Sequence, residues 1–322
     1  MKRRSLLLTL GIAVLSAVSA MAQPSAKDVF ELYNTTVQSY KQDFPTGIAN
    51  MHKVLEMSTE VGEQCDEIKQ KTEQMLPRAY YEYAMALYKN KDLQGTLDNL
   101  EKAEEQAVKY SNTEIKGRVE KTIPKLYNVM GTNKLKEEKY DEAIANFEKA
   151  LHFNPKLLDA QVNIMATYQK AANDEKLLEA MVATKALAQS LNKLDVADDC
   201  NTRLKNFYLK RAEEARAAKN YKVAIENFEQ TVSYDSTDAQ VYRSFANACF
   251  SAENWQLTIA TATKAIDLNQ GTDIDKAAIY HELATAYQKM NNTAKACQMF
   301  EKAAFGEFKP NAEYQIKAMK CK

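Results

Sequence analysis

Glycine and proline are scarce in this chain, with eight glycines and six prolines among 322 residues. Loops that cradle phosphates or present a nucleophile need glycines at close spacing, and none of the patterns G-x-x-x-x-G-K, G-x-G-x-x-G or G-x-S-x-G occurs. No alternating Val, Ile and Thr run of strand length stands out either. These absences argue against nucleotide-binding and hydrolase chemistry and against a β-sheet.

Histidine is equally sparse, with His52, His152 and His281 far apart in the sequence. A zinc-protease helix needs a second histidine four residues after the first, and the chain has Thr285 four residues after His281. We therefore expect no catalytic residues, no metal site and no cofactor, and we do not expect an enzyme.

Neither sign of charge dominates, because 43 basic residues are matched by 43 acidic ones. Proteins that bind nucleic acid usually show a basic patch that neutralises phosphates. The even, finely mixed charge argues against nucleic acid and against anionic membranes as partners.

The five cysteines, at positions 65, 200, 249, 297 and 321, are odd in number and form no C-x-x-C pair. This pattern implies no disulfide framework, although it leaves open whether one pair forms. From their register we expect Cys249 and Cys297 to pack inside as small apolar residues, and Cys321 to be exposed and reactive.

The first residues have the features of a secretory signal peptide. Three basic residues, Lys2 to Arg4, precede an apolar run from Leu6 to Val18, and Ala20-Met21-Ala22 matches a signal-peptidase site. We expect residues 1–22 to be removed, so that the mature chain begins at Gln23 as a periplasmic or extracellular protein without a stable membrane anchor. Arg3-Arg4 leaves the twin-arginine route as an alternative to the general secretory route.

Apolar residues recur at spacings of three and four through most of the chain, with Ala, Leu, Glu, Lys and Gln between them. This period and these residue types are typical of amphipathic helices. The sequence predicts an all-α fold.

The clearest unit is residues 124–157, which reads as helix, tight turn and helix followed by a proline. Its large apolar, small and proline positions are Tyr127, Met130, Gly131, Tyr140, Ala143, Phe147, Ala150 and Pro155. In these positions the segment resembles the 34-residue tetratricopeptide repeat. Lys134 departs from that pattern, since the family usually has an aromatic residue there.

The same register recurs along the chain. Further clear repeats are expected at 77–110, 205–238, 239–272 and 277–310, degenerate ones at 27–61 and 158–191, and a capping helix at 310–320. The resemblance implies a right-handed superhelical solenoid of about seven helix-turn-helix hairpins, filling residues 23–322.

Small residues are expected where two helices cross, as in the pairs Ala84–Thr96, Gly131–Ala143, Ala212–Ala224 and Ala284–Ala296. Larger ones such as Phe147, Phe228 and Phe300 would then fill the space between hairpins. Helix-capping side chains precede the second helices at Asp43, Asp92, Asn220, Asn254 and Asn292.

The family resemblance also implies a function, because the first helices of such repeats line a concave groove that holds a protein or peptide. The candidate groove residues on those helices are Tyr81, Met85, Tyr88, Asn128, Arg243, Asn247, Phe250, His281 and Gln288. We expect a non-enzymatic binding scaffold of the bacterial cell envelope, with neither its partner nor its oligomeric state identified by the sequence. The alternatives are a structural subunit of an envelope assembly, and a carbohydrate-binding module that uses Tyr81 and Tyr88.

Overall fold

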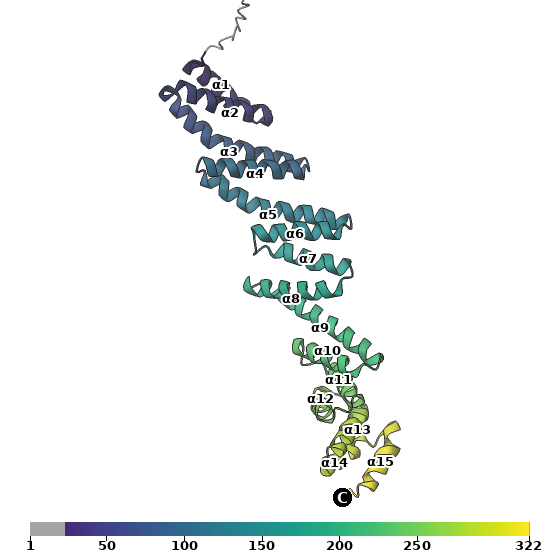
Figure 1. Ribbon diagram of the computed structural model, residues 1–322. Coiled ribbons are helices and arrows are strands. Elements are labelled where there is room, and N and C mark those ends of the chain that lie inside the picture. Colours follow the sequence, from purple (N-terminus) through teal and green to yellow (C-terminus); the bar gives the residue numbers. More distant parts are fainter. Residues whose placement is uncertain (1–22, 322) are drawn as a thin grey trace, which may run out of the picture. The chain divides into compact units, whose positions relative to one another are not determined.

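The computed structural model describes residues 23–321, and in that range the chain forms fifteen α-helices, two short 3-10 helices and no strand (Figure 1). The all-α solenoid expected from the sequence is confirmed. The signal peptide expected at residues 1–22 lies outside the described residues.

The chain divides into two compact units, Met1–Tyr127 and Asn128–Lys322, with the helix α5 (Thr113–Lys136) contributing to both. In the first unit each helix contacts the next from α1 to α4. Its helices are α1 (Ala26–Ser39), α2 (Phe44–Val61), η1 (Glu63–Cys65), α3 (Asp66–Lys89) and α4 (Leu93–Lys109).

The second unit continues this pattern, since each helix from α6 to α15 contacts its successor. Its helices are α6 (Tyr140–Phe153), α7 (Leu158–Lys170), α8 (Asp174–Ser190), α9 (Leu194–Ala217), α10 (Tyr221–Tyr234), α11 (Ala239–Ser251), α12 (Trp255–Leu268), α13 (Asp273–Lys289), α14 (Thr293–Ala303), η2 (Gly306–Phe308) and α15 (Lys309–Ala318).

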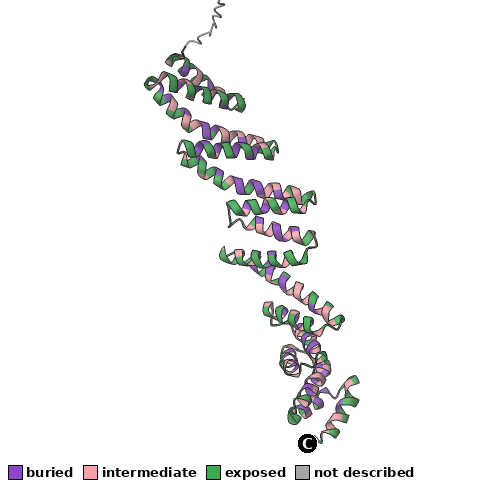
Figure 2. Cartoon of the chain, in the orientation of Figure 1, coloured by how far each residue is buried: buried purple, intermediate pink, exposed green. Residues whose placement is uncertain are grey.

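Small side chains are buried where the helices of a hairpin are expected to cross. All the small residues expected at helix crossings are buried, and buried positions alternate with exposed ones along the helices (Figure 2). Large rings join one hairpin to the next: Phe228 of α10 stacks on Phe245 of α11 with ring centres 5.6 Å apart. A hairpin alone could not cover these rings, so neighbouring hairpins are needed for stability.

One type of turn connects most helix pairs. The second residue after the first helix has a positive φ, as at Lys91, Lys219 and Glu253, and the next residue caps the second helix. At the first of these turns the Asp92 amide donates to the Leu87 carbonyl at 3.0 Å, which closes the preceding helix.

The five capping side chains expected from the sequence are confirmed. Each accepts a hydrogen bond from the backbone N–H three residues later, as Asp92 does from Gly95 at 2.9 Å. This bond satisfies one of the amides that the first turn of a helix leaves without a partner.

The cysteine expectations are confirmed at one site and wrong at two. Cys249 is fully buried, as expected, but Cys297 is half-buried and forms a disulfide with Cys321. The chain reverses after α15 through Lys320, whose φ is +55°, and the Cys321 amide donates to the Ile316 carbonyl at 3.1 Å. This reversal brings the last cysteine back to α14, with the two Cα atoms 5.7 Å apart.

Candidate functional site

A cavity of about 550 Å³ opens on the first helices of three successive hairpins in the second unit. Its central wall is one face of α11, because Gln240, Arg243, Ser244 and Asn247 are spaced three and four residues apart. The other lining residues are Arg216 of α9, Ala278, Ile279 and Glu282 of α13, and Phe308 of η2. The cavity therefore lies on the helix face that the sequence predicted to bind a partner.

A chain of hydrogen bonds crosses the cavity floor. Arg216 donates from Nη1 to the Asn247 side-chain oxygen at 3.4 Å, and Asn247 donates from Nδ2 to Glu282 Oε1 at 2.8 Å. Arg216 also forms an ion pair with Glu213, with Nη2 and Oε2 2.7 Å apart. Asn247 is thus held at both ends of its amide, which fixes the orientation of the floor.

The charged groups of the cavity differ in how far they are engaged. Burial raises the pKa of Glu282, while the Asn247 hydrogen bond and the charge of Arg243 act in the opposite direction. Arg243 is exposed and forms no ion pair with any carboxylate in residues 23–321. Its guanidinium group is therefore a charged donor at this site that is available to a bound molecule.

The third candidate on α11 faces elsewhere. Phe250 is half-buried and packs edge-on against Trp255, with ring centres 5.8 Å apart. Phe250 is absent from the cavity lining, where Phe308 supplies an aromatic surface instead. The structure brings Arg243 and Asn247 together with Glu282 and leaves Phe250 outside.

Two candidates on α13 contact the chain's own last helix. The His281 Nε2 atom lies 2.8 Å from the Asn311 side-chain oxygen, and the His281 ring packs beside Phe308. Gln288 donates to Gln315 Oε1 at 3.0 Å. Asn311 and Gln315 of α15 therefore already occupy the hydrogen-bonding positions beside His281 and Gln288 that a ligand would use.

The candidates at the other end of the chain are placed as follows. Tyr81 is buried, the Arg118 guanidinium lies 4.4 Å from its ring centre, and its hydroxyl lies 3.4 Å from Thr122 Oγ1. Met85 is half-buried and Tyr88 is exposed. Asn128 accepts a hydrogen bond from the Asn163 side chain at 3.0 Å. Tyr81 is thus packed within the fold, whereas Tyr88 is open to solvent.

Sequence reasoning missed Arg216, Gln240, Ser244 and Phe308 as parts of the site. A usable signal existed, since bonded side chains on successive first helices are separated by about one repeat: 31 residues for Arg216 and Asn247, and 35 for Asn247 and Glu282. Polar residues one repeat apart on first helices therefore indicate groove contacts. Phe308 carries no such signal, because it lies on η2, after the second helix of the repeat expected at 277–310.

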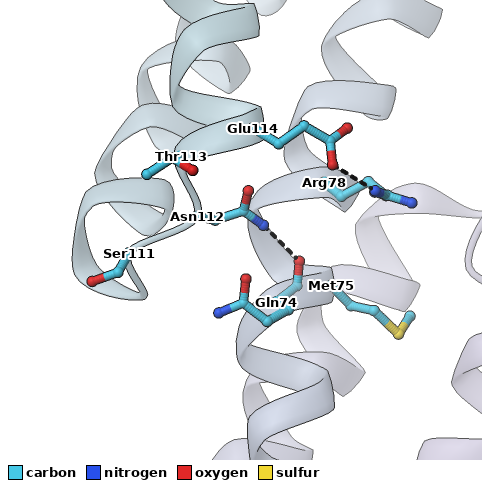
Figure 3. Close-up of a pocket in the computed structure, with 7 residues that line it drawn as sticks. All are labelled: Gln74, Met75, Arg78, Ser111, Asn112, Thr113 and Glu114. Carbon is cyan, nitrogen blue, oxygen red and sulfur yellow. Dashed lines mark hydrogen bonds and ion pairs between the residues drawn. The ribbon is translucent and has the colours of Figure 1, made fainter.

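The first unit contains a different cavity of about 460 Å³, between α3 and the turn before α5 (Figure 3). Its polar groups bond to one another: Arg78 forms an ion pair with Glu114 at 3.2 Å, and the Asn112 side chain donates to the Gln74 carbonyl at 3.2 Å. These contacts tie the two elements together, so we assign this cavity a structural role.

Residues 23–321 contain no group of three or more His, Cys, Asp or Glu side chains placed to hold a metal ion. In the same range, no helix combines the length and the apolar character needed to cross a membrane.

Comparison with known proteins gives one match by sequence. The family model described as "Tetratricopeptide repeat" matches residues 124–157 and 277–304. No curated protein of similar sequence was found.

Three solved structures are among those that match this chain. A tetratricopeptide repeat protein from Parabacteroides merdae is 18% identical, covers 76% of this chain and 98% of its own, and has a TM-score of 0.30. MamA is 16% identical over 61% of this chain and 94% of its own, with a TM-score of 0.29. YrrB, described as a tetratricopeptide repeat protein with an unusual peptide-binding site, is 14% identical over 61% and 91%, with a TM-score of 0.27. Scores of this size carry no inference about function, and the family comparison stands by itself: residues 124–157 and 277–304 match the tetratricopeptide repeat model.

Proposed function

We propose that this protein is an exported, non-enzymatic scaffold that binds an acidic polypeptide segment in the cavity formed by α9, α11 and α13. The observation that carries the proposal is the α11 face, where the exposed Arg243 guanidinium has no ion-pair partner among residues 23–321 and lies on the same helix face as the fixed amide of Asn247. Tetratricopeptide repeats are generally protein-binding scaffolds, which agrees with this assignment.

The cavity offers a different group for each part of a peptide. Gln240 and Ser244 can donate to and accept from main-chain groups, and Arg243 can hold a side-chain or terminal carboxylate with two parallel hydrogen bonds. Phe308 and Ile279 supply an apolar wall for a neighbouring side chain. Glu282 opposes a second anion at the floor, so we expect a segment with a single carboxylate at this point.

The disulfide between Cys297 and Cys321 supports the exported location. Disulfides form and persist in oxidising compartments such as the periplasm and the extracellular space, and are rare in the cytosol. Together with the residue pattern from Lys2 to Ala22, this favours a protein that works outside the cytoplasm.

A displayed peptide library tests the binding proposal. The purified protein should select peptides that carry an acidic residue. Arg243→Ala should weaken the binding of these peptides by about 2 to 5 kcal/mol, the cost of losing a desolvated contact between arginine and carboxylate. Arg211→Ala is the matched control, because Arg211 is an exposed arginine of α9 outside the cavity lining. Equal binding by the two folded variants would place the binding surface elsewhere.

A different variant is needed to test the chain of hydrogen bonds across the cavity floor. Removing the Asn247 amide would leave Glu282 half-buried without its donor and would disturb the fold, so Asn247→Ala alone cannot separate binding from stability. The double variant Asn247→Leu with Glu282→Leu removes both partners together. We expect it to keep its helicity and to lose peptide selectivity.

A further inference from the structure

A second cavity of about 240 Å³ lies outside this site, between α12, α13 and α14. The first site uses Ala278, Ile279 and Glu282 of α13, whereas this one uses other positions of the same helix. It is lined by Thr263 and Ile266 of α12, Tyr280, Leu283 and Tyr287 of α13, and Lys295, Gln298, Met299 and Lys302 of α14. The two cavities therefore belong to separate surfaces.

The rim of this second cavity carries two lysines on one face of α14. Lys295 and Lys302 are seven residues apart, which places them two helical turns apart at a distance of about 10 Å along the axis. The Lys295 ammonium group lies 5.2 Å from the Tyr287 ring centre, and that of Lys302 lies 5.4 Å from the Tyr280 ring centre. Each ring thus holds a cation at the edge of the cavity.

Neither lysine forms an ion pair with a carboxylate in the described part of the chain. Asp273 accepts a hydrogen bond from the Tyr280 hydroxyl at 3.2 Å, so this carboxylate is bonded to a tyrosine and not to either lysine. The two ammonium groups therefore remain available, and together they give the rim a positive charge.

The floor between the lysines is apolar. Leu283 is buried, while Ile266, Tyr287 and Met299 are half-buried and present their remaining apolar surface to the cavity. A hollow with an apolar floor and a charged rim suits a large apolar side chain with anionic groups on both sides. An amphipathic helix provides this combination when carboxylates at positions i and i+7 flank an apolar residue at i+3 or i+4.

We propose that this cavity is a second docking site, for an acidic amphipathic helix of another protein. The helix inserts one large apolar side chain over Ile266, Leu283 and Met299 and places one carboxylate on each of Lys295 and Lys302. The spacing of the lysines matches the i to i+7 spacing of a helix, since both are set by the same rise per residue. The charge of the rim selects an acidic partner over a basic one.

Fluorescence anisotropy tests this proposal with a labelled synthetic helix that carries glutamates seven residues apart and a leucine between them. The purified protein should bind it, and Lys295→Glu with Lys302→Glu should weaken binding about tenfold or more by reversing the charge at both contacts. A peptide with glutamine in place of both glutamates should also bind the unaltered protein more weakly than the original peptide does, because it loses both charge contacts.

The matched control is Lys222→Glu with Lys317→Glu, which makes the same change in net charge at two exposed lysines outside the cavity. It should bind within about twofold of the unaltered protein, because distant exposed charges are screened by salt. An equal loss in both double variants, or no binding by the folded unaltered protein, would overturn the proposal. If the protein self-associates and the peptide prevents this, the occupant is a second copy of this chain. That result would also overturn the proposal.

This site is independent of the cavity on α11, and one variant keeps the two apart. Arg243→Ala should leave the binding of the synthetic helix unchanged. The same variant should bind the peptides selected by the first cavity more weakly than the unaltered protein does. A loss of both activities in that variant would show that the two surfaces are not separate sites.

Discussion

The α carbon of Gly131 in α5 faces the Phe147 ring of α6, so closely that a β carbon on residue 131 would lie 2.6 Å from ring atom Cε1. Real β carbons do not approach other atoms that closely, and Phe147 is fully buried and has little room to move. The absence of a side chain at this position is therefore what lets the two helices pack.

Gly131→Ala should consequently destabilise the protein by about 1 to 3 kcal/mol through overpacking. Gly117→Ala is the matched control in the same helix, because a β carbon there meets nothing within 4 Å. That control should gain about 0.5 to 1 kcal/mol from better helix propensity. Thermal unfolding followed by circular dichroism measures both changes, and a destabilisation of equal size in the two variants would contradict the packing argument.

The contact with Phe147 shows what the sequence could predict and what it could not. The small residue at 131 and the large one at 147 were expected from the repeat register, because a packing role fixes residue size at a fixed spacing. The face of α11 with Arg243 and Asn247 followed from helical spacing in the same way.

Contacts made by elements outside the register could not be predicted in this way. Asn311 and Gln315 meet His281 and Gln288 only because α15 folds back on α13. The pairing of Cys297 with Cys321 depends on the same reversal, which Lys320 makes possible through a left-handed backbone conformation that no sequence pattern announces. Periodicity therefore predicts contacts within repeats, and misses those beyond their ends.

The recurring turns place residues other than glycine in the left-handed conformation. For this reason the turns do not require glycine, and the chain contains few glycines. Ala172 is one of them, with a φ of +52° on an exposed residue between α7 and α8. Its β carbon strains the backbone there, so Ala172→Gly should stabilise the protein by about 0.5 to 1 kcal/mol.

The neighbouring change Ala171→Gly provides the comparison. Ala171 has a right-handed helical backbone with a φ of −73°, so glycine should cost about 0.5 to 1 kcal/mol there. Urea titration of the two variants should give midpoints on opposite sides of the unaltered protein. Shifts in the same direction would show that strain at the turn is not the determining factor.

A partly buried ion pair between Lys205 and Asp235 predicts that the stability of the protein depends on pH in the acid range. Lys205 donates to Asp235 at 2.6 Å, and Thr237 donates to the other carboxylate oxygen from its hydroxyl at 2.7 Å. The Lys205 hydrogen bond, followed by those from Thr237, holds the pKa of Asp235 well below its usual range. A lowered folded-state pKa contributes stability above the unfolded-state pKa of about 4, and that stability is lost as the pH falls further.

Asp235→Asn should therefore lower the free energy of unfolding by about 1 to 3 kcal/mol at pH 7. The difference in this free energy between the variant and the unaltered protein should narrow below about pH 4. Asp198→Asn serves as the control, because Asp198 is exposed and has no ion pair in the described part of the chain. Unfolding curves at pH 7 and pH 3 measure this difference. A constant difference across that range would mean that the ion pair contributes nothing measurable.

Export is tested at the N-terminus. Because Ala20-Met21-Ala22 matches a signal-peptidase site, intact mass and N-terminal sequencing of the protein from its native cell should give a chain that starts at Gln23. Replacing Ala22 with a bulky residue should leave the precursor uncleaved, since the peptidase accepts small residues at this position. Retention of Met1 in the mature protein, or a lipid attached to a cysteine, would contradict the export proposal.

The cysteines divide into one linked pair and three buried thiols, which predicts a specific pattern of chemical labelling. Burial raises the pKa of Cys249 to about 12, and Cys65 and Cys200 are also buried. Iodoacetamide reacts with exposed thiolates, so the folded, unreduced protein should take up no label. After mild reduction it should take up two labels, on Cys297 and Cys321.

The same pair should also hold α15 in place. The disulfide spans 24 residues, and closing a loop of that length contributes about 3 kcal/mol in the chain-entropy description. Cys297→Ala with Cys321→Ala should therefore speed amide hydrogen exchange in residues 309–318 and leave exchange in α11 and α12 unchanged, because each hairpin of a solenoid contacts only its neighbours. A reducing agent should have the same effect on the unaltered protein and none on the double variant. Slow exchange in α15 after either treatment would mean that the contacts of Asn311 and Gln315 with α13 hold the helix without the disulfide.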